Sequence, residues 1–399
     1  MSFALLALIC AVAILGPLVS LGRMMRVPVV IGELAVGVVL GTTGFGVVDA
    51  NEPMLEFLAQ IGFALVMFVA GSHVPIRRRA MLGGLAAGAL RAFGIAAVAV
   101  PLGIGIAALF GTGHGALYAV LIASSSATIV MPALGKTEVR SRSGLEMLAQ
   151  LAIADALCII AVPLVLDPAH VVRSSLGALA VLAVAGVFFL LMDWAERTGR
   201  RERMHRVSKT RGLAMELRIN LALLFTLAAV ATTMHVSVML AGFAMGLAVS
   251  AVGEPRRVAN QTFALTEGFL GPIFFVWLGA SLDLRQLISN PASIWLGVAL
   301  GAVALLAHGL GALTRQPLPL AVSTAAQLGV PVGAAALGKT MGVIQAGEAT
   351  ALLLGAVVTI VVVTLLNRRV VALVSQAPTG AAGPGTGSGL PNRQTDQPS

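Results

Sequence analysis

One carboxylate lies where charged side chains are rare, in the middle of a long apolar stretch. Asp155 is eleven residues from either end of the stretch 144–166. A carboxylate at the centre of a bilayer costs about 2.5–3.5 kcal/mol on insertion scales, so a residue in that position is a functional-site candidate by default. Loss of hydration favours its protonated form, whereas an arriving cation favours its ionised form. A proton and a cation can thus compete for Asp155, as proton-coupled cation transport requires; the alternative is a carboxylate neutralised by a nearby arginine.

Hydroxyl and amide side chains precede a proline in two other apolar stretches. Those before Pro132 are Ser124, Ser125, Ser126 and Thr128, and those before Pro331 are Ser323, Thr324 and Gln327. Their oxygens could satisfy carbonyls freed by a helix break, or bind a hard cation. For any single one of them, packing between helices through small polar residues is an equally good explanation.

Two basic groups are candidate partners for the carboxylate. His308 lies within the apolar stretch 290–313, where it is either simply hydrogen-bonded or a charge partner and pH gate for Asp155. Arg91, inside the stretch 80–110, is the other possible cation.

No Walker motif is present, and both cysteines fall in apolar stretches, so we expect no ATP drive, no metal site and no cofactor. These features predict a transporter, not an enzyme.

The composition is that of a polytopic membrane protein. Hydrophobic residues make up 58% of the 399 residues and charged residues only 11%, whereas soluble domains carry about 25% charged residues. The net charge of +9 resides largely in short loops, where basic residues set membrane orientation, so we expect membrane lipid and no nucleic acid as the partner.

Helical spans of about 20 apolar residues are needed to cross the hydrocarbon core. This criterion predicts an all-α fold with thirteen spans, at about 2–21, 27–46, 54–72, 80–110, 115–135, 144–166, 172–194, 217–235, 237–252, 266–283, 290–313, 316–338 and 346–366. Between the seventh and eighth spans we expect a long basic loop from Arg197 to Arg218. Basic residues are concentrated in alternate loops, which predicts an outer N-terminus and a cytoplasmic C-terminus in a prokaryotic inner membrane. Residues 376–399 are rich in Gly, Pro and Ser and predict a disordered cytoplasmic tail.

A short internal repeat indicates inverted topology. The pentapeptide Ala-Leu-Gly-Lys-Thr occurs at 133–137 and again at 336–340, although the chain holds only three lysines. In the predicted topology the first copy ends its span inside and the second ends its span outside. Inverted repeats of this kind are common in secondary transporters, where the site lies at the midplane between interrupted helices. Chance similarity between membrane helices rich in small residues is the alternative.

These residues resemble the second monovalent cation:proton antiporter family, which includes sodium–proton antiporters and potassium-efflux transporters. The most specific match is the segment 274–284, Phe-Phe-Val-Trp-Leu-Gly-Ala-Ser-Leu-Asp-Leu, and 27–33, Val-Pro-Val-Val-Ile-Gly-Glu, resembles an early family element. Asp155, followed by Pro163 and Leu164, stands where the family carries its ion-binding aspartate. At 71–75, however, Gly-Ser-His-Val-Pro replaces the frequent family pattern Gly-x-Glu-x-Asp.

The resemblance implies a homodimer with an exchanger domain over residues 1–375. Its dimerisation part would comprise about 1–79 and 217–283, and its moving core about 80–166 and 290–370. The fifth and twelfth spans would be broken helices that cross beside Asp155, with Ser125, Ser126 and Thr128 in the first and Gln327 in the second.

Two departures from the family pattern affect the expected mechanism. The residue before Asp155 is Ala154, where electrogenic members have a second aspartate and potassium-efflux members a glutamine, and His308 stands where many members have a lysine. A single carboxylate predicts electroneutral exchange of Na⁺ or K⁺ for H⁺ by alternating access. The alternatives are a potassium-efflux antiporter, or a membrane sensor that keeps the fold without transport.

Overall fold

The structure is a computed structural model that describes residues 3–14, 29–72, 79–134, 137, 139–211, 213–234, 236–253, 256–282, 284–285 and 290–376. Its helices in the first half are α1 (Phe3–Ala13), α3 (Val29–Leu40), α4 (Pro53–Ser72), α5 (Arg79–Phe110), α6 (Gly115–Ala123), α7 (Ala127–Leu134), α8 (Arg142–Leu166), η1 (Pro168–His170) and α9 (Val171–Arg197). Those in the second half are α10 (Arg200–Arg211), α11 (Met215–Thr233), α12 (Val238–Val252), α13 (Arg256–Leu265), η2 (Thr266–Leu270), α14 (Gly271–Ala280), α16 (Pro291–Gly309), η3 (Leu310–Thr314), α17 (Leu318–Ser323), α18 (Gly329–Thr340) and α19 (Ala346–Ser375).

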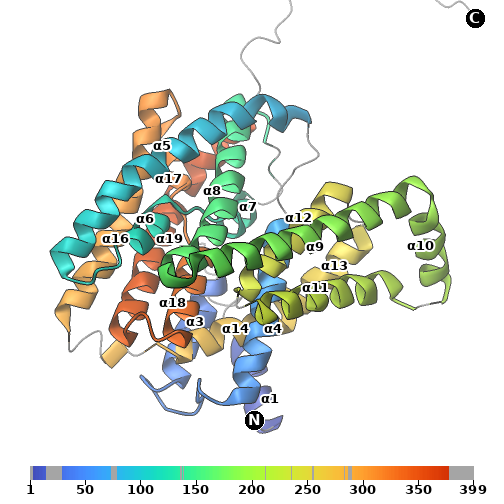
Figure 1. Ribbon diagram of the computed structural model, residues 1–399, viewed down its shortest axis with the longest axis horizontal. Coiled ribbons are helices and arrows are strands. Elements are labelled where there is room, and N and C mark those ends of the chain that lie inside the picture. The colour runs from blue at the N-terminus through green and yellow to red at the C-terminus, as the bar shows by residue number, and fades with distance from the viewer. Residues whose placement is uncertain are drawn as a thin grey trace, which may run out of the picture.

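Within this described part the fold is entirely helical, without a strand (Figure 1). Eight of its helices are long and apolar enough to cross a membrane, and the apolar α12 is shorter. The prediction of an all-α polytopic membrane protein is therefore confirmed. The total of thirteen spans and the inverted repeat stay predictions, and the tail after residue 376 lies outside the described residues.

Several predicted boundaries and one predicted loop differ from the structure, and α19 extends nine residues beyond the expected end at 366. The second span was expected to reach residue 46, but α3 ends at Leu40 in a glycine-rich turn in which Gly46 has a φ of 66°. The tenth was expected to begin at 266, but α13, the π-helical η2 and α14 run without a break from Arg256; its first turns are polar, so hydropathy could not reveal them. The expected loop 197–218 contains α10, whose Glu202 and Arg206 pair at 3.3 Å one turn apart.

Two expected spans are interrupted at their hydroxyl-rich segments. The chain leaves α6 at Ala123 and enters α7 at Ala127, and it leaves α17 at Ser323 and enters α18 at Gly329. At the first interruption Ser124 takes an extended conformation, and its amide and hydroxyl both donate to the Leu121 carbonyl, at 3.0 and 2.8 Å. The serine thus supplies a hydrogen bond that the helix loses at its end.

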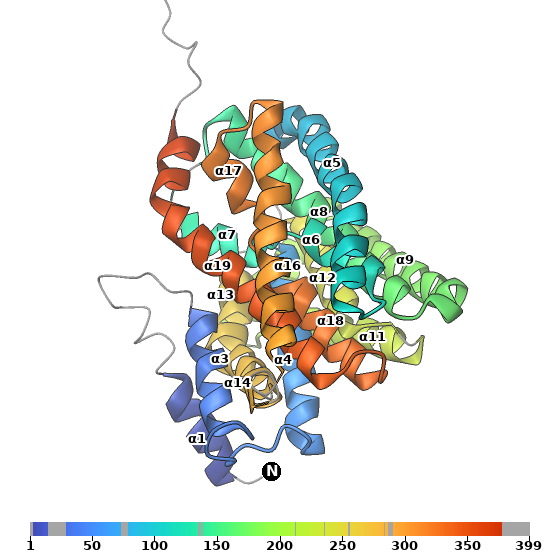
Figure 2. The same ribbon diagram turned by 90° about the vertical axis from the view of Figure 1, so that its left-hand side faces the viewer.

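Small residues let neighbouring helices approach closely in two groups. In the first group, α4 packs on α12 and α3 on α14; a Cβ on Gly242 of α12 would overlap the Ala64 carbonyl of α4. In the second group, α5 packs on α6 and α8, and α16 on α19. Close backbone approach is the usual way to associate helices in lipid, where apolar burial gives little drive. Figure 2 shows α3, α4 and α14 together, below the set formed by α16, α17 and α19.

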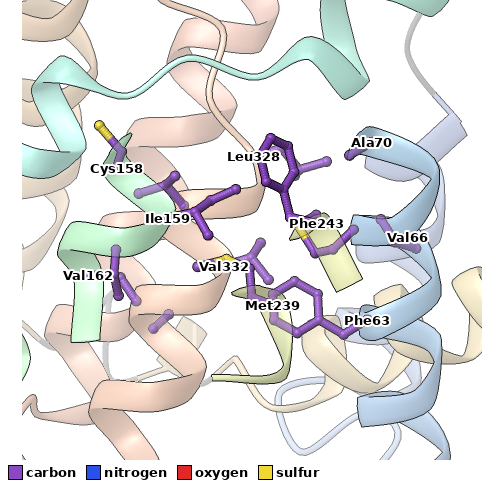
Figure 3. Close-up of a cluster of buried hydrophobic side chains, with 14 of the residues drawn as sticks. Phe63, Val66, Ala70, Cys158, Ile159, Val162, Met239, Phe243, Leu328 and Val332 are labelled. Atoms are coloured by element: carbon purple, nitrogen blue, oxygen red, sulfur yellow. The ribbon is translucent and has the colours of Figure 1, made fainter. Parts of the chain in front are cut away.

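The two groups meet across a layer of buried apolar side chains. Figure 3 shows Phe63, Val66 and Ala70 of α4 with Met239 and Phe243 of α12 on one side of this layer. On the other side are Cys158, Ile159 and Val162 of α8 with Leu328 and Val332 of the second interrupted span. The layer lies one turn along α8 from Asp155.

Candidate ion-binding site

Asp155 is held inside the molecule by α8. This helix begins after Ser141, whose hydroxyl accepts the Gly144 amide at 3.1 Å as an N-cap. Asp155 follows more than three turns later and is only 3% exposed. Its carboxylate accepts a hydrogen bond from the backbone N–H of Ala127. Because Ala127 is the first residue of α7, the carboxylate faces the positive end of a helix dipole.

The first interruption contributes buried hydroxyl groups from the segment 124–126. Ser125 Oγ donates to the Thr324 carbonyl at 2.7 Å, so this contact joins the first interruption to the second. Ser126 is also buried, at 1% exposure. Thr128 lies in the first turn of α7, but its side chain is outside the described part of the structure. The expected crossing of two interrupted spans thus has direct contact through Ser125.

The second interruption contains two buried polar side chains, the hydroxyl of Thr324 and the amide of Gln327. The backbone N–H of Gln327 donates to Thr359 Oγ1 of α19 at 3.3 Å. The Gln327 side chain is 4% exposed, and its Nε2 has no hydrogen-bond partner in the described structure. Gln327 therefore lies at the second interruption, and its side chain carries one buried N–H donor group without a partner among the described residues.

His308 bridges the two interruptions. Its Nδ1 lies 2.7 Å from Thr324 Oγ1 and its Nε2 lies 3.1 Å from the Ile122 carbonyl of α6. A carbonyl can only accept, so Nε2 must carry a proton. The imidazole is fully buried. This ring thus satisfies a carbonyl near the end of α6 and holds it to the second interruption.

Two glutamines that are not among the predicted site residues extend this polar network. Gln150 Nε2 of α8 donates to Thr324 Oγ1 at 3.0 Å, and Gln316 Nε2 donates to Gln150 Oε1 at 3.2 Å. Both side chains are buried. Gln150 could have been noticed as a polar residue within the same apolar stretch as Asp155, but its partner Thr324 is 174 residues away in the chain.

Arg91 has an acidic partner other than Asp155. Its Nη1 lies 2.8 Å from Glu146 Oε2, with both side chains 8% exposed, and its Nε donates to Thr314 Oγ1 at 2.8 Å. Arg142 binds the other oxygen of Glu146 at 3.0 Å. Among the described residues, neither Arg91 nor His308 forms an ion pair or hydrogen bond with the Asp155 carboxylate.

The site offers oxygen ligands of the kind that hard cations prefer. Across the described ranges, no cluster of three or more His, Cys, Asp or Glu side chains could hold a metal ion. The crossing offers one carboxylate together with hydroxyl and carbonyl oxygens, which are ligands for hard cations. Within the segments that resemble the family, residues 27–28, 73–75 and 283 lie outside the described structure.

A family model and several known proteins are similar to this chain. The family model described as "Sodium/hydrogen exchanger, transmembrane" matches residues 10–372. A putative Na⁺/H⁺ antiporter, YjbQ, of Bacillus subtilis is 24% identical over 90% of this chain and 61% of its own length. The glutathione-regulated potassium-efflux protein KefC of Enterobacter sp. is 29% identical over 72% of this chain and 47% of its own. The chain thus spans less than two thirds of either relative.

A shorter relative and a solved structure agree with this result. The Na⁺/H⁺ antiporter of Enterococcus hirae is 25% identical over 71% of this chain and 73% of its own. The sodium proton antiporter MjNhaP1 of Methanocaldococcus jannaschii has a similar fold, with a TM-score of 0.63 over 96% of this chain and all of that chain, at 15% identity. Since the family model covers nearly the whole described structure, the chain belongs to the sodium/hydrogen exchanger family of membrane transporters.

Proposed function

We propose that this protein exchanges a monovalent cation, Na⁺ or K⁺, for H⁺ by alternating access around Asp155. The observation that carries the proposal is the isolation of this carboxylate. It is buried and accepts a hydrogen bond from the start of α7, and no basic side chain pairs with it in the described structure. An ionised carboxylate in such surroundings is unfavourable until a positive charge arrives. A proton or a metal cation can supply that charge, and each excludes the other.

One carboxylate has room for one charge, so the exchange should be one for one. Ala154, the residue before Asp155, is buried and apolar and offers no second acid. After binding, either occupant leaves the site neutral, and a neutral site crosses the apolar layer at lower cost than a charged one. We infer that the loaded and protonated forms are the ones that change access.

The remaining ligands are proposed from the oxygens at the crossing. Ser125 donates its only hydroxyl proton to Thr324, which leaves its lone pairs available to a cation. Ser126, Thr128 and the Gln327 amide are the further candidates on the two interrupted spans. These groups would replace water around a desolvated cation.

The assembly and orientation are part of the same proposal. The helix group containing α3, α4, α12 and α14 would form the dimerisation part, and the group containing α5–α8 and α16–α19 the moving core. The protein would be a homodimer in a prokaryotic inner membrane, with its N-terminus outside. The close packing inside each group supports motion of one group against the other.

The test is cation-dependent proton movement in proteoliposomes that contain a pH-sensitive dye. Pulses of Na⁺, K⁺ and Li⁺ should be compared, with the Asp155→Asn variant as the matched control. A response to Na⁺ or K⁺ that the variant lacks would support antiport, and preference for K⁺ would favour a potassium-efflux role. No response to any cation would favour a sensor that has kept the fold without transport.

A further inference from the structure

A cavity separates the two helix groups at the end of the molecule where α4 and α19 begin. Its volume is about 220 Å³. One wall consists of residues before and in the first turn of α4 and the last turns of α14; the other consists of the last turns of α18 and the first turns of α19. In the predicted orientation this end faces outward. If the proposed alternating access is correct, this cavity must close when the opposite side opens.

Two opposite charges line this cavity, one on each wall. Glu56 of α4 and Lys339 of α18 are the charged residues among its lining side chains. Glu56 has only a marginal hydrogen bond, 3.5 Å from Gln60 Nε2, and no ion pair joins it to Lys339 in the described structure. The rest of the lining is neutral and mostly apolar, including Trp277, Leu278 and Leu353.

Each wall is held together internally. On the α4 side, Trp277 Nε1 of α14 donates to the Ala50 carbonyl at 2.9 Å, which ties the segment before α4 to the end of α14. On the α18 side, Gly338 packs directly against Ile344 in the short turn before α19, so the end of α18 is tied to the turn that leads into α19. A relative motion of the two helix groups would therefore move Lys339 and Glu56 with their own walls.

The surface between α18 and the opposite group is suited to sliding. Gly329 lies against Met67 of α4, and Gly333 lies against Met239 of α12, so at these two positions a flexible thioether side chain meets no opposing side chain. No bulky side chain at either glycine interlocks with the opposite group. Lys339 follows Gly329 by ten residues, or about 15 Å along the helix, and would be displaced with it.

We propose that Lys339 and Glu56 form an ion pair that holds this cavity closed in the alternate state. As the walls approach, each charge loses water, and an unpaired charge becomes costly in the narrowing apolar space. Pairing the two side chains offsets that cost. The position of Lys339 in the last turn of α18 also favours a cation, because the C-terminal end of a helix is negative.

The experiment measures how accessible the cavity is. Both native cysteines are replaced by alanine and Ser281, which lines the cavity, is replaced by cysteine. The labelling rate with a membrane-impermeant maleimide is then measured in intact cells for Glu56→Lys, Lys339→Glu and the double swap. Arg173→Glu, an exposed charge on α9 away from the cavity, is the matched control.

Each single reversal should speed labelling about two- to five-fold, since partly exposed ion pairs contribute up to about 1 kcal/mol. The double swap should return to within two-fold of the parent, and Arg173→Glu should have no effect. Independent, multiplying effects of the two reversals would overturn the ion pair. Labelling of the Ser281→Cys variant in everted vesicles but not in intact cells would show that the cavity does not face outward.

The same variants separate this proposal from the proposed function. A chain that exchanges no cation, yet shows labelling that depends on the charge swap, would refute antiport and keep the pair. A chain that exchanges cations normally, with labelling indifferent to both charges, would refute the pair and keep antiport.

Discussion

Asp155 combines burial, a helix N-terminus and the absence of a basic partner among the described residues. The Ala127 amide stabilises negative charge there, but one hydrogen bond does not replace full hydration. For the proposed exchange, the site would have to alternate between a neutral, protonated form and an ionised form that binds a cation. An exchange site needs this alternation, because neither form should be so stable that it is never released.

We predict that Asp155→Asn abolishes exchange and leaves folding intact. An amide fills the same volume and is neutral, so the variant should melt at the same or a higher temperature than the parent. The exchange rate measured with the pH-sensitive dye should fall at least about 100-fold, because the amide cannot bind and release the proton. Size-exclusion chromatography and thermal melts provide the control. Exchange at the wild-type rate would remove Asp155 from the mechanism.

His308 is either a pH gate for Asp155 or only a hydrogen-bonded bridge, and three variants separate the two roles. If its imidazolium pairs with Asp155 in another state, His308→Ala and His308→Gln should both shift the activity profile to alkaline pH, whereas His308→Lys should weaken cation binding near neutrality. As a bridge, the ring satisfies the Ile122 carbonyl. Alanine should then cost about 1–3 kcal/mol of stability, and glutamine should restore much of it.

The two readouts for His308 are the pH–activity curve and the melting temperature of each variant. Curves that superimpose on the wild-type curve would eliminate the gate. Unchanged melting temperatures would eliminate the bridge. Each role can thus fail without the other.

Helices in this protein are joined by two different devices. Between α4 and α12 the contact is glycine against backbone, which needs no polar group. Between α5, α8 and η3 it is a buried ion pair, Arg91 with Glu146, supported by Thr314. The glycine contact tolerates no added side-chain volume, and the ion pair tolerates no loss of one partner.

We predict that Glu146→Gln destabilises the protein by about 3–5 kcal/mol, because Arg91 is left as a buried, unpaired charge. The double variant Arg91→Met, Glu146→Leu should recover most of the loss. Arg142→Gln, which removes the exposed partner of the same carboxylate, should cost no more than about 1 kcal/mol. Chemical denaturation or thermal melting in detergent checks all three. A double variant as unstable as the single one would show that the pair does not act as a unit.

We predict that Gly242→Val separates α4 from α12 and lowers the yield of folded protein sharply. A Cβ there meets the Ala64 carbonyl, which belongs to a helix backbone and cannot move aside. The matched control is Gly186→Ala in α9, where nothing lies within 4 Å of an added Cβ. That variant should be as stable as the parent or up to about 1 kcal/mol more stable. Equal yields for the two variants would contradict the close contact.

At the scale of the whole molecule, the two closely packed helix groups meet across an apolar layer, part of which is drawn in Figure 3. Asp155 lies on the α8 side of this layer, one turn from Cys158 and Ile159. An ion that crossed unaccompanied would pay for its charge in the apolar surroundings. A cation carried as a neutral pair with Asp155 avoids that cost, and a proton bound to Asp155 avoids it in the same way.

We therefore predict that exchange is electroneutral. In proteoliposomes with clamped internal pH, the exchange rate should not respond to an imposed membrane potential, because one proton and one monovalent cation occupy Asp155 in turn. The measurement compares rates at zero and inside-negative potential set by an ionophore. A clear voltage dependence with a matching current would exclude one-for-one exchange.

Sequence was sufficient for properties that reside in single stretches of chain. The membrane class and most helix positions follow from hydropathy, which depends only on nearby residues. The cost of a buried charge makes Asp155 a candidate on the same local basis, and its role stays a prediction. Hydropathy does not locate a helix end where polar turns begin the helix, as at Arg256, or where an apolar, glycine-rich turn follows it, as after Leu40.

The partners of the buried polar groups could be found only from the packed structure. Arg91 meets Glu146 across 55 residues of sequence, and His308 meets Ile122 across 186. Such pairs depend on how each helix is rotated about its axis, and a shift of one residue turns a side chain by about 100°. Hydropathy cannot resolve that rotation in spans that are apolar on every side. Tertiary packing therefore selects which polar groups meet, and it leaves Asp155 without a basic partner among the described residues.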